Sequence, residues 1–365
     1  MIGVGIIGTG FGAAVHVPGF LALPDVKVVG VASARYERAR ETAHRFSLDH
    51  AFADWRDLVD SPAVDAVAIA TPPSCHGPMV LRALAARKAV LCEKPLALTA
   101  DEAERLHDAA TTASVTHAVD FEFREIPAWR YVHRLLTDGV AGRIRHVNVN
   151  WVVGSWADPE RSWSWRASDA EGGGTLGALA AHAFDYIEWL LGPVASVAAH
   201  LATRVASRPD ERGLTRAVTS EDCCHLLLEL ASGVPVSLAI SAIAPVGKGH
   251  WVEIYGEDTV IVLRNTNVAD YARGVEVLVG RRGDDALTPA DIPRGLRLTT
   301  EFADGRVAPF VSLAQRFIEA VHVRGRMRPS FYDGWRAQLV ASAARRAHRE
   351  RRWVDVDAPT ERKDS

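Results

Sequence analysis

Short apolar runs alternate with stretches of helical spacing along the first third of the chain. The apolar runs cover residues 2–7, 26–32, 64–70 and 89–92, and the helical stretches cover residues 14–23, 34–46 and 78–86. Buried strands that alternate with helices are typical of a parallel sheet with helices on both faces. The pattern therefore predicts an α/β fold whose first domain, residues 1–120, is a doubly wound Rossmann sheet.

The pattern changes after residue 120, where apolar positions tend to recur every second residue, as in strands with one buried face. Such strands are predicted at residues 144–153, and two hairpins are predicted from residues 225–230 with 234–242 and from residues 251–255 with 259–263. We expect helices at residues 175–191, 310–324 and 332–349, loops at residues 207–218 and 281–295, and a flexible tail at residues 358–365. Residues 121–357 are interpreted as a second domain that binds the substrate and contributes to oligomerisation.

The composition narrows the classes of partner. The net charge of −3 gives no broad cationic surface, so we expect neither a nucleic acid nor a membrane as a partner. The four cysteines include no C-x-x-C pair, so we expect no metal site. No apolar run reaches the roughly 18 residues of a membrane helix, and no basic segment precedes the short apolar start, as a signal peptide would need. These features favour a cytoplasmic protein.

A glycine-rich turn follows the first predicted strand. It consists of Gly8, Thr9, Gly10, Phe11, Gly12 and Ala13, in the pattern G-x-G-x-x-A. Gly8 permits the tight turn, Gly10 lets a pyrophosphate approach the backbone, and Ala13 is small enough for the next helix to pack on the strand. The amides at the start of that helix would face the phosphates. The turn therefore predicts a dinucleotide site.

The residues after the second predicted strand bear on the choice between NAD and NADP. NAD-binding folds usually carry an acidic residue here, which accepts hydrogen bonds from the ribose hydroxyls. This chain has Ser33, followed by Arg35 and Arg38. A hydroxyl with two arginines suits a 2′-phosphate better than a bare diol, so we expect NADP to be preferred and NAD to be the alternative. In the other interpretation the two arginines form a solvated helix face.

Several motifs, taken in their order along the chain, resemble one enzyme family. They are the glycine turn with His16 and Pro18; Thr71, Pro72 and Pro73 with His76; Glu93, Lys94 and Pro95; Trp165 with Arg166; and Gly172, Gly173 and Gly174 followed by His182 and Asp185. Together they resemble the glucose–fructose oxidoreductase, inositol dehydrogenase and MocA family. The resemblance implies an NAD(P)-dependent oxidoreductase whose second domain is an α+β domain with a large, mostly antiparallel, open sheet. It also places the strand-end motifs, His76 and Arg166 near the cofactor.

Lys94 is the leading candidate for proton transfer. It follows a buried strand, so its ammonium group could reach the edge of the sheet beside the nicotinamide. Partial burial and nearby positive charge would lower the pKa of Lys94 toward a useful range. The resemblance assigns this lysine to hydrogen bonding and proton transfer at the substrate oxygen, and it implies a cis Lys94–Pro95 bond. We expect Glu93 to fix backbone or cofactor geometry; the alternative is an exposed Lys94 that pairs with Glu93.

His182 is the second candidate, because an imidazole can act as an acid or a base near neutral pH. Asp185 lies three residues later on the same helix face, where its carboxylate could set the histidine tautomer. The resemblance implies an aspartate four residues before His182, but this chain has Ala178 there. Glu122 is a possible substitute for that carboxylate. In the alternatives His182 works without a partner, is a core histidine bonded to a backbone carbonyl, or belongs to a site that has lost ordinary dehydrogenation.

A short segment holds four tryptophans: Trp151, Trp156, Trp163 and Trp165. Their rings could stack on the apolar faces of a sugar, or they could pack in the core or across a subunit interface. We expect at most two of them to line the site. The predicted substrate contacts are Lys94, Glu122, Trp165, His182 and Asp185, and the expected partner is a small molecule, a carbohydrate or polyol.

These motifs predict a dehydrogenase or reductase that acts on CH–OH groups. It would transfer a hydride between the nicotinamide and a sugar, polyol or glycoside hydroxyl or ketone. The alternatives are a reductase of a non-sugar carbonyl or imine, and a dinucleotide-binding protein without turnover, which the alanine at position 178 favours. An antiparallel sheet with one open face needs a cover, so we also expect a homodimer or homotetramer.

Overall fold

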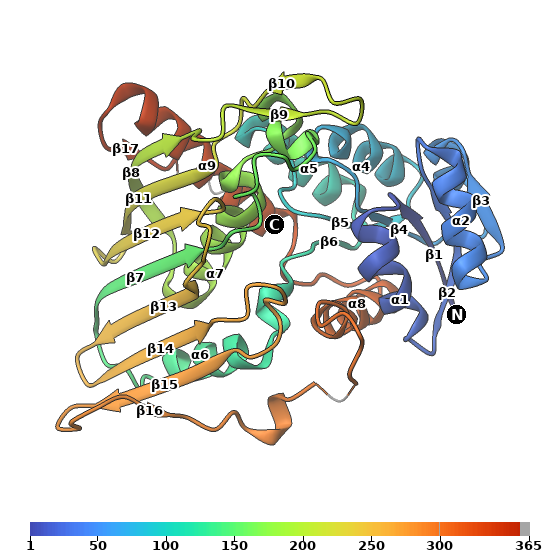
Figure 1. Ribbon diagram of the computed structural model, residues 1–365. Helices are drawn as coiled ribbons and strands as arrows, with labels where there is room; N and C mark the ends of the chain where they lie inside the picture. Colours follow the sequence, from blue (N-terminus) through green and yellow to red (C-terminus); the bar gives the residue numbers. More distant parts are fainter. Residues whose placement is uncertain (299, 358–365) are drawn as a thin grey trace.

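A six-stranded parallel sheet forms the first part of the protein (Figure 1). The computed structural model describes residues 1–298 and 300–357, so the predicted tail at residues 358–365 lies outside the described residues. The strand order is β3-β2-β1-β4-β5-β6, with bounds β1 Ile2–Ile7, β2 Val26–Ala32, β3 His50–Phe52, β4 Ala66–Ile69, β5 Ala89–Cys92 and β6 His117–Val119. The order reverses between β1 and β4, where the carboxyl ends of the strands leave room for a ligand.

Helices cover both faces of this sheet, which explains why its strands are almost entirely apolar. Alternate residues of β4 belong to two hydrophobic clusters, Ala66 and Ala68 to one and Val67 and Ile69 to the other. The first cluster includes side chains of α1 and α8, and the second includes side chains of α4 and α5. The helices near this sheet are α1 Val17–Leu21, α2 Tyr36–Phe46, α3 Trp55–Asp60, α4 His76–Ala85, α5 Ala100–Ala113 and α8 Val307–His322.

A nine-stranded sheet forms the second part, in the order β16-β15-β14-β13-β7-β12-β11-β8-β17. Its neighbouring strands are antiparallel except for β7 and β12, which are parallel. The bounds are β7 Ile144–Val152, β8 Val194–Ala202, β11 Cys223–Leu230, β12 Pro235–Ser241, β13 Gly249–Gly256, β14 Thr259–Asn265, β15 Glu276–Arg281, β16 Thr288–Pro289 and β17 Val354–Asp355. The predicted mostly antiparallel sheet is therefore confirmed.

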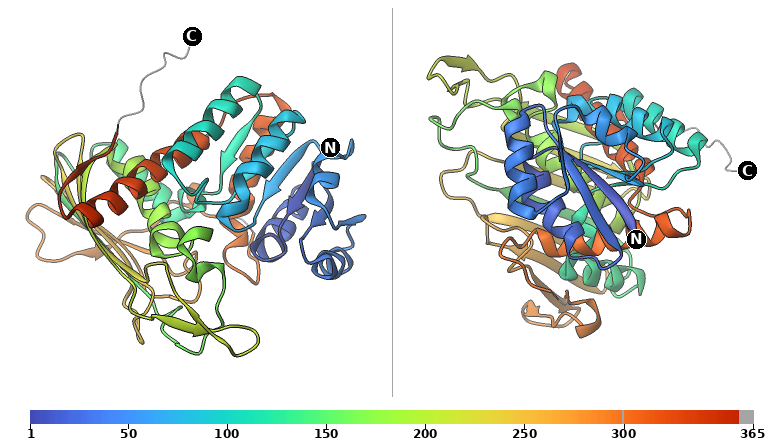
Figure 2. Two further views of the ribbon diagram at one scale, coloured as in Figure 1. Left: turned by 90° about the horizontal axis from the view of Figure 1, so that it is seen from above. Right: turned by 90° about the vertical axis from the view of Figure 1, so that its right-hand side faces the viewer.

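Three helices lie between this large sheet and the parallel sheet (Figures 1 and 2): α6 Pro127–Thr137, α7 Ala181–Leu191 and α9 Phe331–Glu350. Helix α9 contacts β8 of the large sheet and β6 of the parallel sheet, so it joins the two parts. The opposite face of the large sheet carries no helix in these views, and β11 alternates buried and exposed residues as a half-buried strand does.

Two predictions of loop structure were wrong. The segment 207–218 contains β9 Ser207–Pro209 and β10 Thr215–Ala217, which pair with each other. The segment 281–295 contains β16, which pairs with β15, and the short 3₁₀ turn Arg294–Leu296. All residues of β10 and β16 are exposed, so their sequences show no alternation of buried apolar and exposed polar positions from which a strand could be predicted.

The helices predicted at residues 14–23 and 175–191 both begin with a π-helical turn, at Gly12–His16 and at Leu176–Ala180. Such turns are rare and occur often at functional sites. Within the described residues, no helix combines the length and the apolar character that crossing a membrane requires.

Candidate active site

The largest cavity that contains predicted site residues lies at the carboxyl ends of the parallel strands and has a volume of about 940 Å³. Its walls come from both parts of the chain. The parallel sheet supplies the glycine turn and the segments after β2, β4 and β5, and the second part supplies tryptophans, the π-helical turn before α7 and two loop residues. The predicted residues in its wall are Gly8, Thr9, Gly10, Phe11, Ser33, Arg35, Arg38, Thr71, Pro72, Pro73, Glu93, Lys94, Glu122, Trp165, Arg166 and His182.

The glycine turn has the shape that a dinucleotide requires. Gly8 has φ of +114°, and a Cβ there would lie 2.2 Å from the carbonyl oxygen of Ala70, so no other residue fits. A Cβ on Gly10 would have no neighbour within 4 Å, which shows that its backbone faces open space. That openness allows the close approach of a pyrophosphate. Gly12 and Ala13 lie outside the cavity wall, where Gly12 packs against Ile6.

The segment after β2 forms one end of the cavity. Ser33 Oγ accepts hydrogen bonds from Thr9 Oγ1 and from the backbone N–H of Arg35, both at 3.2 Å. The guanidinium of Arg35 lies 3.5 Å from Glu211, which the β9–β10 hairpin contributes. Arg38 lies in the same wall and is exposed. This end of the cavity therefore presents a hydroxyl and two guanidinium groups.

His76 does not lie in the cavity wall, contrary to the expectation of a direct cofactor contact. It is fully buried, with Nδ1 3.0 Å from the carbonyl oxygen of Pro95 and Nε2 3.0 Å from that of Thr71. The two carbonyl groups belong to turns that both line the cavity. His76 therefore links these turns from behind.

Lys94 occupies the wall at the end of β5, after which the Lys94–Pro95 peptide bond is cis, as the resemblance implied. Its Nζ donates a hydrogen bond of 2.8 Å to the carbonyl oxygen of Ala178. Burial lowers the pKa of Lys94, and the charge of Arg166 contributes in the same direction, while Glu93 and Glu122 oppose this shift. The lysine is thus fixed by a main-chain acceptor and carries a weakened preference for its charged form.

Ala178 lies in the π-helical turn Leu176–Ala180, directly before α7. Its methyl group lines the cavity at the position where the resemblance implies an aspartate. The Lys94 bond to its carbonyl oxygen shows that the backbone, not a side chain, supplies the partner of the lysine here.

Glu122 brings a carboxyl group into the same cavity and is only 2% exposed. The hydroxyl of Tyr271 donates a hydrogen bond to Glu122 Oε1, whereas Oε2 is buried and has no hydrogen-bond partner among the described residues. Burial raises the pKa of Glu122 well above its usual value, and the charge of Asp120 adds to the shift. The carboxyl group therefore favours its protonated form, with one oxygen available to a ligand.

His182 lines the cavity, but Asp185 does not set its tautomer. The Asp185 carboxylate lies outside this wall and is bound by Arg124, at 3.0 Å from Nε and 2.6 Å from an Nη atom. Within the described part of the chain, His182 Nδ1 has no hydrogen-bond partner. Burial lowers the pKa of His182 well below 6.5, so the ring is neutral. Asp185 binds Arg124 in preference to His182, because a bidentate charged pair is stronger than a hydrogen bond to a neutral imidazole.

Three of the four clustered tryptophans line the cavity, one more than expected: Trp151, Trp156 and Trp165. The guanidinium of Arg166 lies 4.7 Å from the ring centre of Trp165. Trp163 lies elsewhere, because its Nε1 donates to the carbonyl oxygen of Ala217 in β10. The wall of the cavity thus combines aromatic surface with charged groups, as sites for small polar ligands do.

Comparison with known proteins decides the family. Residues 2–121 match the model of an oxidoreductase family with an NAD-binding Rossmann fold, and residues 133–356 match the model of the C-terminal alpha/beta domain of the same family. The chain belongs to the GFO/IDH/MocA oxidoreductase family.

Relatives of this GFO/IDH/MocA protein match it over nearly its whole length. An uncharacterised oxidoreductase of Synechocystis sp. is 38% identical, over 97% of this chain and 95% of that protein. Levoglucosan dehydrogenase of Pseudarthrobacter phenanthrenivorans is 30% identical, over 97% of this chain and 98% of that protein. A solved structure of levoglucosan dehydrogenase in complex with NADH and L-sorbose has a TM-score of 0.89 and 29% identity, and the match covers 98% of this chain and 99% of that one.

The side chains in the cavity of this GFO/IDH/MocA protein that escaped the sequence reasoning include Trp55, Arg56, Tyr271 and Arg306. Tyr271 lies between β14 and β15, and its ring stacks on Phe123 with the centroids 5.2 Å apart. Arg306 precedes α8, and its guanidinium lies 5.3 Å from the ring centre of Phe11 in the glycine turn. No local pattern marks these residues, because only the tertiary fold brings their segments to the cavity.

Proposed function

We propose that this GFO/IDH/MocA oxidoreductase is an NADP-preferring dehydrogenase of a cyclic sugar or polyol, or a reductase of the matching ketone. The observation that carries the proposal is the position of Lys94. Its Nζ is fixed by the Ala178 carbonyl group in the wall of the cavity that also contains the glycine turn. A proton-transfer group and a dinucleotide cradle therefore share one enclosed space.

The chain itself must handle the proton of this reaction, because a bound nicotinamide supplies or accepts only the hydride. In the oxidation of an alcohol, the neutral amine of Lys94 accepts the hydroxyl proton while the hydride leaves carbon, and a ketone results. In reduction the ammonium group returns that proton. An ammonium group has three donors, and the Ala178 carbonyl group takes one of them, so two remain for the substrate oxygen and its neighbours.

We assign to Glu122 the part that an aspartate at position 178 would otherwise take. Its unpartnered Oε2 is buried and can hydrogen-bond to a substrate hydroxyl, and Tyr271 fixes its other oxygen. His182 lines the same cavity as a neutral ring and offers a further hydrogen-bonding nitrogen. Lys94, Glu122 and His182 then form the proton-handling set.

The substrate class is supported by the cavity and by two relatives. The rings of Trp151, Trp156 and Trp165 offer flat apolar surface, on which the C–H face of a sugar or polyol ring can stack. Besides levoglucosan dehydrogenase, the relatives include inositol 2-dehydrogenase 1 of Saccharopolyspora erythraea, which is 30% identical over 366 residues. Both names describe oxidation of a hydroxyl group on a cyclic polyhydroxy compound.

The preference for NADP is supported by the end of the cavity after β2. The only acidic residue in the segment from Ser33 to Arg38 is Glu37, which pairs with Arg40 and does not line the cavity. Ser33, Arg35 and Arg38 do line it. A dianionic 2′-phosphate gains more from two guanidinium groups than a ribose diol does.

The test is a screen of purified protein with levoglucosan, inositols, common sugars and their keto forms, each with NAD and NADP and followed by nicotinamide absorbance. We expect turnover of at least one cyclic substrate and a higher kcat/KM with NADP. The Lys94→Met variant should lose at least about 100-fold in kcat, because it removes the proton-transfer group. It should still bind the dinucleotide.

The matched control is Lys27→Met, which removes a half-exposed lysine that pairs with Asp49 and lies outside the cavity. It should leave kcat unchanged. Silence across the whole panel, or a Lys94→Met variant as active as the parent, contradicts the proposal. If the parent and Lys94→Met both bind the dinucleotide and neither turns over any substrate, a binding protein without catalytic activity is favoured instead. A higher kcat/KM with NAD than with NADP would reverse the cofactor preference.

A further inference from the structure

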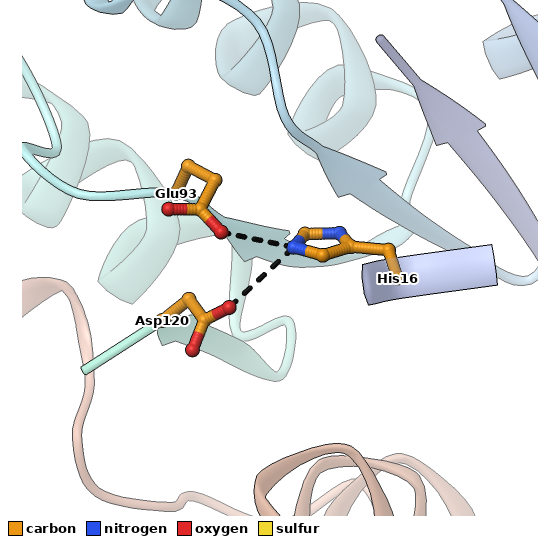
Figure 3. Close-up of side chains that lie close together, drawn as sticks. All are labelled: His16, Glu93 and Asp120. Atoms are coloured by element: carbon orange, nitrogen blue, oxygen red, sulfur yellow. Dashed lines mark hydrogen bonds and ion pairs between the residues drawn. The ribbon is translucent and has the colours of Figure 1, made fainter. Parts of the chain in front are cut away.

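A buried cluster of three titratable residues (Figure 3) adjoins the cavity, because one of them, Glu93, is also part of the cavity wall. His16 closes the π-helical turn after the glycine turn, Glu93 follows β5, and Asp120 follows β6. His16 Nε2 lies 2.9 Å from Glu93 Oε1 and 3.4 Å from Asp120 Oδ2. The exposed fractions are 0% for His16, 9% for Glu93 and 2% for Asp120, so the protonation states of these three buried groups depend strongly on one another.

Apolar rings close the other sides of His16. Phe310 stacks on the imidazole with the centroids 4.4 Å apart, and Phe11 meets it edge-on at 5.7 Å. His16 Nδ1 and both Asp120 oxygens have no hydrogen-bond partner in the part of the chain that the structure describes. Glu93 is the one member of the cluster that also lines the cavity.

The protonation of the cluster changes near neutral pH. Burial lowers the pKa of His16, but the two carboxylates outweigh it and raise the pKa to about 9. Burial raises the pKa of Asp120 to about 7, with the charge of Glu93 adding to the shift. Burial alone would raise the pKa of Glu93, but His16 holds it below its usual value. As the pH rises through about 7, the net charge therefore passes from zero to −1 as Asp120 ionises.

Glu93 and Lys94 lie side by side in the chain and both line the cavity. If the adenosine half of the dinucleotide occupies the end near Ser33 and Arg38, then the nicotinamide half occupies the end near Lys94. The oxidised nicotinamide ring carries a positive charge that the reduced ring lacks. A negative charge held at this end of the cavity therefore favours the oxidised form over the reduced one.

We propose that His16 and Asp120 are positioning residues that hold the Glu93 carboxylate beside the nicotinamide, and that this cluster sets how strongly the chain prefers the oxidised over the reduced dinucleotide. The inference rests on the dinucleotide site of the proposed function, but it requires no particular substrate. Neither His16 nor Asp120 lines the cavity, so both act through Glu93.

Other titratable and charged groups also act on the cluster from the surrounding elements. They are Lys94, Arg166, Glu122, Tyr271, His76 and Cys92. Loss of a proton from Lys94 would also favour the oxidised ring as the pH rises, so the wild-type profile alone does not identify the responsible group. Substitutions inside the cluster do identify it, because they leave Lys94 in place.

The experiment measures the dissociation constants of oxidised and reduced NADP by tryptophan fluorescence, from about pH 6 to about pH 8.5, the window around the Asp120 pKa of about 7. The result is expressed as the ratio of the reduced to the oxidised constant. Both forms share the adenosine half, so titration of the 2′-phosphate cancels in that ratio. In the wild type, we expect the ratio to rise about tenfold with pH, the effect of one unit charge near the ring.

In two variants the ratio of the dissociation constants should no longer change with pH, and it should be low in one variant and high in the other. Asp120→Asn keeps the cluster neutral across the window, so its ratio should stay at the low wild-type plateau. His16→Gln removes the positive charge and leaves the two carboxyl groups to share one proton, so its ratio should stay at the high plateau. The matched control is Asp185→Asn, another buried acid whose pKa burial raises to about 7 but which lies outside the cavity, and it should keep the wild-type profile.

The outcomes separate this inference from the proposed function. A wild-type ratio that does not change with pH overturns the inference, whether or not any variant folds. The inference is also overturned if the two variants have the same ratio, or if the ratio of Asp120→Asn changes with pH as it does in the wild type. The expected profiles without turnover of any sugar or polyol support the inference and contradict the proposed substrate class. A wild-type protein that binds neither form overturns both.

Discussion

At the scale of single residues, two different groups could take the place of the aspartate side chain that is missing at position 178. Ala178 has no side-chain acceptor, but its carbonyl oxygen receives the hydrogen bond from Lys94 Nζ at 2.8 Å. A carboxyl group is present in the same cavity at Glu122, 56 positions earlier in the sequence, where Tyr271 donates a hydrogen bond to it. A comparison of motifs alone shows the alanine as a loss, whereas the fold shows two groups that can share the lost role.

Glu122 is the residue on which this replacement depends. Changing Glu122 to Gln keeps the size of the side chain and an acceptor for Tyr271, but it removes the exchangeable proton. We expect kcat to fall by about 100-fold, with a smaller change in KM. The pKa of Glu122 is raised by burial and by Asp120, so wild-type activity should decline as the pH rises through that pKa and the carboxyl proton is lost. The decline should be absent from the variant, and a pH–rate profile of both proteins measures it.

Glu125 provides the matched control for that experiment. It is a buried glutamate in the same short 3₁₀ segment, Glu122–Glu125, but it accepts a hydrogen bond from Ser312 and lies outside the cavity. Glu125→Gln should keep the wild-type kcat and pH profile. If Glu122→Gln keeps them as well, Glu122 has no part in proton handling.

At the scale of elements, prediction succeeded where an element's own side chains are buried. The strands predicted at residues 26–32 and 89–92 coincide with β2 and β5, because runs that are apolar apart from the exposed Lys27 leave little choice of boundary. Prediction failed for β10 and β16, whose residues are all exposed and therefore carry no pattern of buried apolar positions. Helix α5 was not predicted, although Thr99 caps it by accepting a hydrogen bond from the Glu102 N–H, a signal that could have revealed it.

Some residues of the candidate site could likewise be predicted from the sequence, and others could not. Residues at the ends of predicted strands, such as Ser33 and Lys94, could be assigned to the cavity from the sequence, since parallel strands end at one edge of the sheet. Tyr271 and Arg306 could not, because they lie outside regular elements and reach the cavity only through the packing of the second part. The exclusion of Asp185 also depended on tertiary structure, since its partner Arg124 lies in a different segment.

Arg124 joins three elements and offers a test of their packing. Its guanidinium binds Asp185 of α7 and Asp333 of α9, with Nη–O distances of 2.6 and 2.9 Å, and all three side chains are buried. Arg124→Met removes the bidentate partner of the buried Asp185 and leaves Asp333 with Arg328 at 3.7 Å, so the free energy of unfolding should fall by about 3–5 kcal/mol. Urea denaturation measures this change. The half-buried Arg130 of α6 is the control, and Arg130→Met should change the free energy by less than about 0.5 kcal/mol.

The sign of the pH dependence follows from the carboxyl groups. The pKa of Asp185 is already raised by burial to about 7 in the presence of Arg124, and removal of the cation raises it further. A raised carboxyl pKa contributes stability at low pH that is lost as the pH rises through it. The deficit of Arg124→Met should therefore be larger at pH values above about 7 than at mildly acidic pH. A deficit that does not change with pH would show that lost packing, and not the unpaired charge, causes the destabilisation.

At the scale of the whole molecule, the cavity exists because two different sheets meet across a shared layer of helices. The parallel sheet supplies the groups suited to a dinucleotide, and the second part supplies the aromatic wall and Tyr271. Helix α9 contacts strands of both sheets, so it helps to fix the two parts of the chain that form the cavity relative to each other (Figure 2). Among the residues that the structure describes, no helix covers the far face of the nine-stranded sheet.

That open face is where we expect a second copy of the chain to bind. Leu227 lies in β11, the third strand from the β17 edge of the sheet, is 53% exposed, and is flanked across the strands by the small residues Ser237 and Ala198. Covering a leucine on a flat sheet removes apolar surface from water, and a homodimer or homotetramer would do so symmetrically. Light scattering on the purified protein should therefore give the mass of two or four chains. Leu227→Arg should shift the assembly toward the monomer, whereas Leu81→Arg, at a leucine of α4 that is 46% exposed, should leave the mass unchanged. A wild-type protein that is monomeric at micromolar concentration would show that the open face needs no cover.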